Sequence, residues 1–224
     1  MFIVIEGPDK VGKTEQARLL AEYLRSLGRQ VDSYSFPSRG TLTGRVAREW
    51  MGGGDSALRA AGSDAQFSRD VAVTFQCVQL VDKYAAVPAV LRSLRDGQDV
   101  VCCRWWQSSY AYGLDEGLPL DWLADTCSLM PRADLNVLVD LPPEVVAARS
   151  ARSGSRLDRY DRDLSKQERV RQTYLVLWSA REHSGLRGEG RWVLVDGHGT
   201  PGEVHERVKT QVSYTRKIPL EVRR

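Results

Sequence analysis

The stretch Gly7-Pro8-Asp9-Lys10-Val11-Gly12-Lys13-Thr14 restricts the possible folds of this 224-residue chain more than any other feature. It has the spacing G-x-x-x-x-G-K-[ST], follows the apolar run Phe2–Ile5 and precedes an amphipathic helical pattern. That is the strand–loop–helix context of a phosphate-binding loop. Its glycines let backbone N–H groups surround a phosphate, and the start of the helix directs its positive end to the same point. The alternative is an ordinary glycine turn.

Individual residues of this loop have separate expected roles. Lys13 is placed to reach the β- and γ-phosphates of a nucleotide, and the Thr14 hydroxyl can ligate Mg²⁺. Asp9 is unusual in an anion-binding loop because its carboxylate repels phosphate. We expect Asp9 to bind another group, such as a sugar hydroxyl, or alternatively to cap the helix. The residues expected to bind ATP are Gly7, Lys10, Val11, Gly12, Lys13 and Thr14.

The rest of the chain predicts an α/β fold. Helical patterns alternate with further strand-like runs, which favours a parallel sheet with helices on both faces. No repeat or linker divides the chain, so we expect a single domain over residues 1–214 and a basic C-terminal tail over residues 215–224. The strand-like runs are Phe2–Ile5, Gln30–Ser35, Val100–Cys103, Leu135–Leu141 and Trp192–Val195.

Charge and composition exclude several classes of protein. Lys and Arg number 32 and Asp and Glu 29, so a net charge of +3 argues against a general nucleic-acid or membrane-surface binder. No apolar run approaches the ~20 residues that a membrane-spanning helix needs. The four cysteines contain no C-x-x-C pair, and we therefore expect reduced thiols and a cytoplasmic location.

Ordered fragments over most of residues 2–180 resemble the thymidylate kinase family, of which this chain looks like a divergent member. Any one fragment is a weak signal, whereas the whole set in family order is specific. The fragments are Glu6-Gly7-x-Asp9-Lys10-x-Gly12-Lys13-Thr14-x-Gln16, Phe36-Pro37-Ser38-Arg39, Asp82-Lys83, Arg104-x-x-x-Ser108, Ala111-Tyr112, Asp134-Leu135 through Glu144, Leu157-Asp158-Arg159-Tyr160 and Gln167-Glu168-Arg169-Val170.

The resemblance implies transfer of the γ-phosphoryl group of ATP to dTMP, with Mg²⁺ as cofactor. It implies a three-layer P-loop NTPase fold with a five-stranded parallel sheet, usually in a homodimer packed through helices. It assigns the phosphate clamp to Arg39 and Arg104, whose planar guanidinium groups bind phosphate oxygens in pairs; the alternative for each is a surface arginine. The implied acceptor-binding residues are Asp9, Phe36, Arg39, Gln79, Lys83, Arg104, Ser108, Tyr112 and Gln167.

An arginine-rich segment over residues 149–163 resembles the lid of the family. Arg149, Arg152, Arg156 and Arg159 share one face if the segment is helical, and like charges at this spacing destabilise an isolated helix. This favours an external anion as the partner of these arginines, and the alternative is an exposed basic helix face. Arg156 and Arg159 are the expected phosphate contacts, and the resemblance places Asp161 near the metal together with Thr14.

Three positions depart from the family pattern. Gln79 stands where a stacking phenylalanine is usual, and Lys83 where an arginine that binds the base is usual; Trp105, Trp106, Tyr110 and Tyr112 offer either replacement aromatic surface or core packing. Cys103 stands in place of an aspartate that organises Mg²⁺, and a thiol is a poor ligand for this hard cation.

These departures leave two alternatives to a dTMP kinase. One is a kinase of the same fold that prefers dUMP, a modified pyrimidine or another deoxynucleotide. The other is a nucleotide-binding protein with weak or lost catalysis, unless Asp161, Glu6 or Asp140 compensates for the missing carboxylate.

Overall fold

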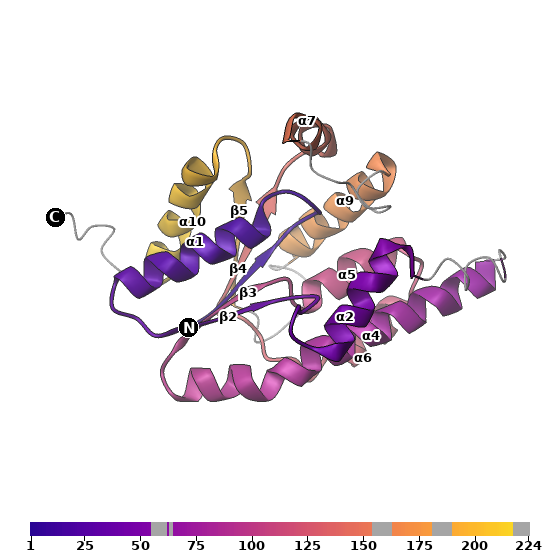
Figure 1. The fold of residues 1–224 in the computed structure, drawn as a ribbon, viewed down its shortest axis with the longest axis horizontal. Coiled ribbons are helices and arrows are strands. Elements are labelled where there is room, and N and C mark those ends of the chain that lie inside the picture. Colours follow the sequence, from indigo (N-terminus) through magenta and orange to yellow (C-terminus); the bar gives the residue numbers. More distant parts are fainter. Residues whose placement is uncertain (55–61, 63–64, 154–162, 181–189, 217–224) are drawn as a thin grey trace.

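The computed structural model describes residues 1–54, 62, 65–153, 163–180 and 190–216 (Figure 1). Within them lies a five-stranded parallel sheet with the strand order β2-β3-β1-β4-β5. The predicted α/β class is confirmed, and the end of each predicted strand lies within one residue of the observed end. The strands are β1 (Phe2–Glu6), β2 (Val31–Ser35), β3 (Asp99–Cys103), β4 (Leu135–Asp140) and β5 (Arg191–Asp196).

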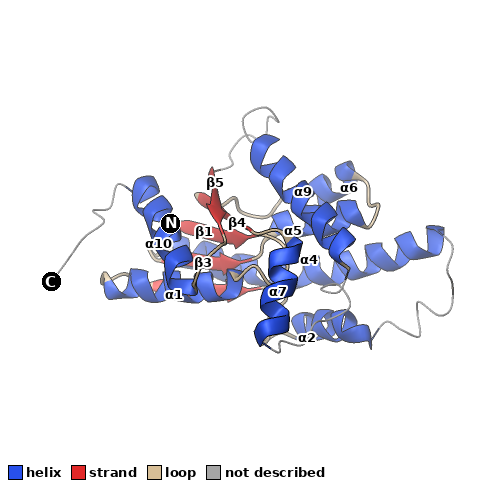
Figure 2. Ribbon diagram, turned by 90° about the horizontal axis from the view of Figure 1, so that it is seen from above, coloured by secondary structure: helices blue, strands red, loops and turns tan. Residues whose placement is uncertain are grey.

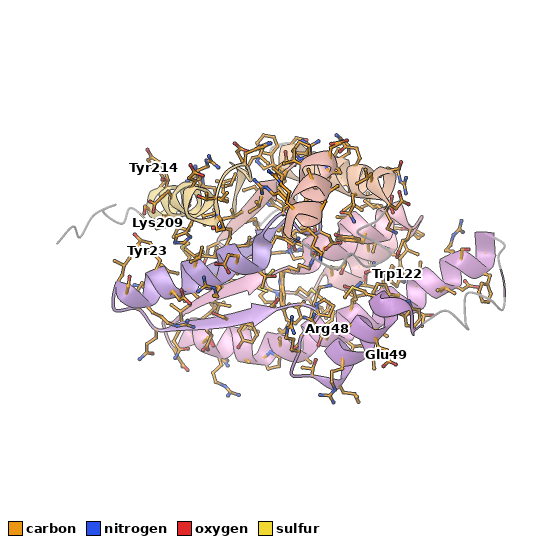
Figure 3. All side chains as sticks on the ribbon, turned by 45° about the horizontal axis from the view of Figure 1, so that its top comes forward. Tyr23, Arg48, Glu49, Trp122, Lys209 and Tyr214 are labelled. Atoms are coloured by element: carbon orange, nitrogen blue, oxygen red, sulfur yellow. The ribbon has the colours of Figure 1, made fainter. Side chains whose placement is uncertain are left out.

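One face of the sheet is covered by α1 (Lys13–Ser26) and α10 (Pro201–Arg216), which lie together in Figure 1. Side chains alternate between the faces of a strand, so Ile3 and Ile5 of β1 both point into this core. At the surface the Lys209 ammonium lies 5.1 Å from the centre of the Tyr23 ring, which joins the two helices (Figure 3).

The opposite face is covered by α4 (Ala65–Arg95), α5 (Trp106–Asp115), α6 (Leu120–Cys127) and α9 (Leu164–Ala180). Phe2 and Val4 of β1 point into this second core. It also holds Trp105 and Trp106, whose exposed fractions are 0% and 1%. The Trp105 ring packs edge-on against Phe2, with 5.7 Å between the ring centres.

The loops that follow β1, β2 and β3 meet at the carboxyl edge of the sheet. In parallel α/β sheets ligands bind at this edge, where the strand order reverses. The helices that begin from these loops are α1, α2 (Leu42–Glu49) and α5, and α2 continues into η1 (Trp50–Gly54). Figure 2 shows α2, α5 and α7 (Pro143–Ser153) near the ends of the strand arrows.

Apolar spacing along α4 predicts that Val71, Val78, Val81 and Ala85 form its packed face, but the helix buries a different face. Val71 is buried, but Val81 is 54% exposed and Ala85 is also exposed, whereas Gln76 and Lys83 are almost fully buried. The reason is that α4 packs on α5, which presents the Ser109 hydroxyl to the Lys83 ammonium.

Among the described helices, including the 31-residue α4, none combines the length and apolar character needed to cross a membrane.

Candidate active site

A cavity of about 500 Å³ opens at the carboxyl edge of the sheet. It is bounded by the phosphate-loop segment after β1, by the connection after β2, and by α2, α4 and α5. The cavity brings together most of the residues singled out in the sequence. Those that line it are Asp9, Lys10, Gly12, Lys13, Thr14, Phe36, Arg39, Gln79, Cys103, Arg104, Ser108 and Tyr112.

The phosphate loop has the backbone geometry that its glycines predict. Gly7 and Gly12 have φ angles of 141° and 99°, a region that side chains disfavour. A Cβ atom on Gly7 would lie 2.3 Å from the carbonyl oxygen of Val139, so only glycine fits. Helix α1 begins directly after Gly12, which places the N–H groups of its first turn around the cradle.

Lys13 lies almost buried beside this cradle, with 5% of its surface exposed. Its ammonium group donates a hydrogen bond to the carbonyl oxygen of Pro8. Burial, reinforced by the charge of Arg104, lowers the pKa of Lys13 to about 8. An anionic phosphate bound here would offset this cost of burial, because it places negative charge beside the ammonium group.

Arg104, Asp9 and Tyr112 form a charged cluster across the cavity. The Arg104 guanidinium is ion-paired with Asp9 and lies 5.2 Å from the centre of the Tyr112 ring. The Tyr112 hydroxyl donates to the other Asp9 carboxylate oxygen over 2.6 Å. Burial alone raises the pKa of Asp9, but the charges of Arg104 and Lys13 outweigh it and hold that pKa below its usual value. Asp9 is thus an acceptor-only group that faces the cavity.

Apolar side chains also line the cavity. Phe36 and Phe75 line it together with Gln79, so aromatic surface is present although position 79 carries an amide. The predicted clamp residue Arg39 also lines the cavity and is exposed. Trp105, Trp106 and Tyr110, by contrast, belong to the core, where their exposed fractions are 5% or less.

Arg48 of α2, labelled in Figure 3, lines the cavity and was missed in the sequence. One guanidinium nitrogen donates to the carbonyl oxygen of Pro37, and the buried Nε atom has no hydrogen-bond partner among the described residues. Burial and the nearby Arg39 lower the pKa of Arg48. Its position on the helix that follows β2 was the only available signal, because no motif singled it out.

Two predicted acceptor residues lie beside the cavity and do not line it. Lys83 is 1% exposed, and its ammonium donates to Ser109 Oγ over 3.0 Å between α4 and α5. Burial lowers the pKa of Lys83 to about 8. Gln167 of α9 accepts a hydrogen bond from the backbone N–H of Asp9 over 3.3 Å, so it supports the phosphate loop from behind.

The predicted lid is described only in part. Arg149 of α7 donates to the carbonyl oxygens of Gly197 and Gly199, over 3.0 and 3.1 Å. Arg152 is exposed near the end of α7. Arg156, Arg159 and Asp161 lie outside the described residues.

A hard cation beside the phosphate loop would need oxygen ligands. The Thr14 hydroxyl faces the cavity and fits Mg²⁺, whereas the Cys103 thiol, 3.7 Å from it, does not. Glu6 and Asp140 do not replace the missing carboxylate: Glu6 accepts three hydrogen bonds and Asp140 is ion-paired with Arg171. No group of three or more His, Cys, Asp or Glu side chains among the described residues is arranged to hold a metal.

Comparison with known proteins agrees with this geometry. The family model described as "Thymidylate kinase" matches residues 5–208. The chain is 33% identical over 217 residues to a "Probable thymidylate kinase" of Pyrococcus abyssi, covering 95% of this chain and 96% of the relative. It is 32% identical over 224 residues to a "Thymidylate kinase" of Thermomicrobium roseum, covering 96% of each. The chain therefore belongs to the thymidylate kinase family, a family of nucleoside monophosphate kinases.

Proposed function

We propose that this protein transfers the γ-phosphoryl group of ATP to dTMP, giving ADP and dTDP. The observation that carries the proposal is that one cavity is lined both by the glycine cradle with Lys13 and by the two arginines Arg104 and Arg39. Two anionic nucleotides can approach end to end only where positive charge surrounds the space between them. The names of the relatives support the same reaction.

The residues of the cavity have distinct proposed roles. Lys13 and the loop N–H groups bind the β- and γ-phosphates of ATP, while Arg104 and Arg39 hold the acceptor phosphate in line with them. Arg156 and Arg159 add charge over the transferred group. Thr14, with Asp161 nearby, would hold Mg²⁺, which when bound would supply positive charge to the phosphate oxygens.

The acceptor nucleoside is proposed to lie over α4 and α5. Asp9 accepts from a sugar hydroxyl, and Tyr112 packs beside the sugar. The base lies against Phe36, where the amide of Gln79 and the hydroxyl of Ser108 supply polar contacts. Gln167 acts from behind the cavity through the backbone of Asp9. Lys83 acts from behind this surface through Ser109.

A second candidate is the same reaction with a different base. Gln79 lines the cavity and its amide offers both a donor and an acceptor, which suits several base edges. Loss of catalysis is the third candidate and rests on Cys103.

We further propose that residues 1–214 act as one domain in the cytoplasm, as a homodimer without nucleic-acid or membrane partners. The four unpaired thiols support the cytoplasmic location.

A coupled ADP-release assay tests these candidates with ATP, Mg²⁺ and a panel of dTMP, dUMP, dGMP, dCMP and modified pyrimidine monophosphates. We expect the highest kcat/KM with dTMP, and loss of turnover in Lys13→Ala because the transferred phosphate loses its buried cation. A monophosphate preferred over dTMP by about tenfold, or about 1.4 kcal/mol, establishes the second candidate. Absence of turnover with every monophosphate refutes the proposed reaction.

A further inference from the structure

Glu6 is a fully buried carboxylate that none of the roles above uses. It is the last residue of β1, directly before the phosphate loop, and its exposed fraction is 0%. A buried carboxylate is costly unless several donors bind it. The identity and position of those donors therefore indicate what Glu6 does.

Three donors from two other elements converge on Glu6. The backbone N–H of Trp105 donates to Oε1 over 2.6 Å. The hydroxyls of Ser108 on α5 and Tyr174 on α9 each donate to Oε2 over 2.8 Å. Burial and the adjacent Glu6 carboxylate raise the pKa of Tyr174 well above the usual tyrosine range, so its hydroxyl stays a donor.

Two of these donors, the Trp105 N–H and the Ser108 hydroxyl, link Glu6 to the backbone and the guanidinium group of Arg104. Arg104 has a φ angle of 66°, a left-handed conformation that costs a non-glycine residue about 1 kcal/mol or more and persists only when its surroundings enforce it. Glu6 binds the N–H of the next residue, Trp105, and so holds the backbone in this conformation. At the other end of the side chain, Arg104 Nη1 donates to Ser108 Oγ over 3.2 Å, and Glu6 orients that hydroxyl.

We propose that Glu6, supported by Tyr174, is a positioning residue that sets both the backbone conformation and the guanidinium orientation of Arg104 for the acceptor phosphate. The inference rests on the proposed function, since it concerns the clamp of that reaction. Tyr174 lies on α9, which follows the lid region and also supports Asp9 through Gln167. The acceptor clamp is thus held by three elements, β1, α5 and α9.

A double-mutant cycle with steady-state kinetics tests the inference. Glu6→Gln and Tyr174→Phe are each measured alone and in an Arg104→Ala background. We expect each single variant to lower kcat/KM for the acceptor by about tenfold while KM for ATP changes less than about twofold. In the Arg104→Ala background the same changes should cost little, because the group through which Glu6 acts is gone.

Matched controls separate positioning from general damage. Tyr84→Phe removes a hydroxyl that donates to the Thr126 carbonyl over 2.7 Å outside the cavity, and Asp99→Asn removes a buried carboxylate at the opposite end of the sheet. Both should leave KM for the acceptor unchanged. Equal losses with and without Arg104 would overturn the inference, as would parallel losses in KM for ATP.

A binding measurement tests the role of Glu6 separately from the proposed reaction. If wild-type protein phosphorylates no monophosphate, the proposed function is wrong, and calorimetric binding of dTMP to the same variants then decides the role of Glu6. Weaker dTMP binding in Tyr174→Phe than in Tyr84→Phe supports the inference in that case. Equal binding by the two variants, or no binding by the wild type, overturns it.

Discussion

At the scale of single residues, Cys103 has the chemistry that fits its position least. Its thiol lies 3.7 Å from the Thr14 hydroxyl, at the place where a cation over the phosphates would be held. A carboxylate there would add a hard oxygen ligand, which Mg²⁺ prefers to sulfur. We therefore expect Cys103→Asp to raise kcat with Mg²⁺ by about tenfold in the ADP-release assay.

The control for this prediction is Cys103→Asn, which has nearly the same shape as aspartate but carries no charge. It should not raise kcat, and the ratio of Mn²⁺-supported to Mg²⁺-supported rates should fall only in Cys103→Asp. Similar kinetics in the two variants would show that the thiol does not limit the use of the metal.

At the scale of elements, the connection between β1 and α1 depends on Gly7. A Cβ atom there would meet the Val139 carbonyl oxygen at 2.3 Å, and the φ angle of 141° disfavours any side chain. Gly7→Ala must therefore displace the cradle from β4. We expect ATP affinity, measured by calorimetry, to fall by about tenfold or more.

Gly28→Ala is the matched control, since Gly28 has a φ angle of 77° at the end of α1 but open space around it. It should lower the free energy of unfolding by about 1 kcal/mol and leave ATP affinity unchanged. Unaltered ATP affinity in Gly7→Ala would contradict the role given to this close contact.

Helix α4 shows the limit of prediction from sequence at this scale. Apolar spacing predicted that Val71, Val78, Val81 and Ala85 share a packed face, yet only Val71 is buried and Val78 is half-buried. Periodicity cannot tell which face meets α5, and here Lys83 fills that interface because a serine hydroxyl is available to its ammonium. Arg48 was not predicted for a similar reason, since only the position of α2 in the folded chain places it at the cavity.

At the scale of the whole molecule, strand–helix alternation and the phosphate-loop motif were enough to predict the parallel sheet and the loop that begins the site. These features are local in sequence, so patterns can show them. The Glu6 network is different: it joins residues 6, 105, 108 and 174 through buried hydrogen bonds. Long-range polar contacts of this kind follow from packing, and no spacing rule indicates them.

The proposed homodimer has physical support in the exposed stripe of α4. Cys77, Val81, Ala85 and Pro88 follow one another at helical spacing and are all exposed, with 54% of the Val81 surface accessible. Covering such a stripe with a second copy removes apolar area from water at about 25 cal/mol per Å². A stable interface of this type buries on the order of 1,000 Å² or more, so its centre should tolerate charge poorly.

We expect light scattering after size exclusion to show a dimer for the wild-type protein at micromolar concentration. Val81→Glu should give a monomer, because two carboxylates would face each other across the symmetric contact. Val176→Glu, the same change at a valine of α9 that is 60% exposed, should remain a dimer. A monomeric wild type, or equal dissociation of both variants, would place the apolar stripe of α4 outside any subunit contact.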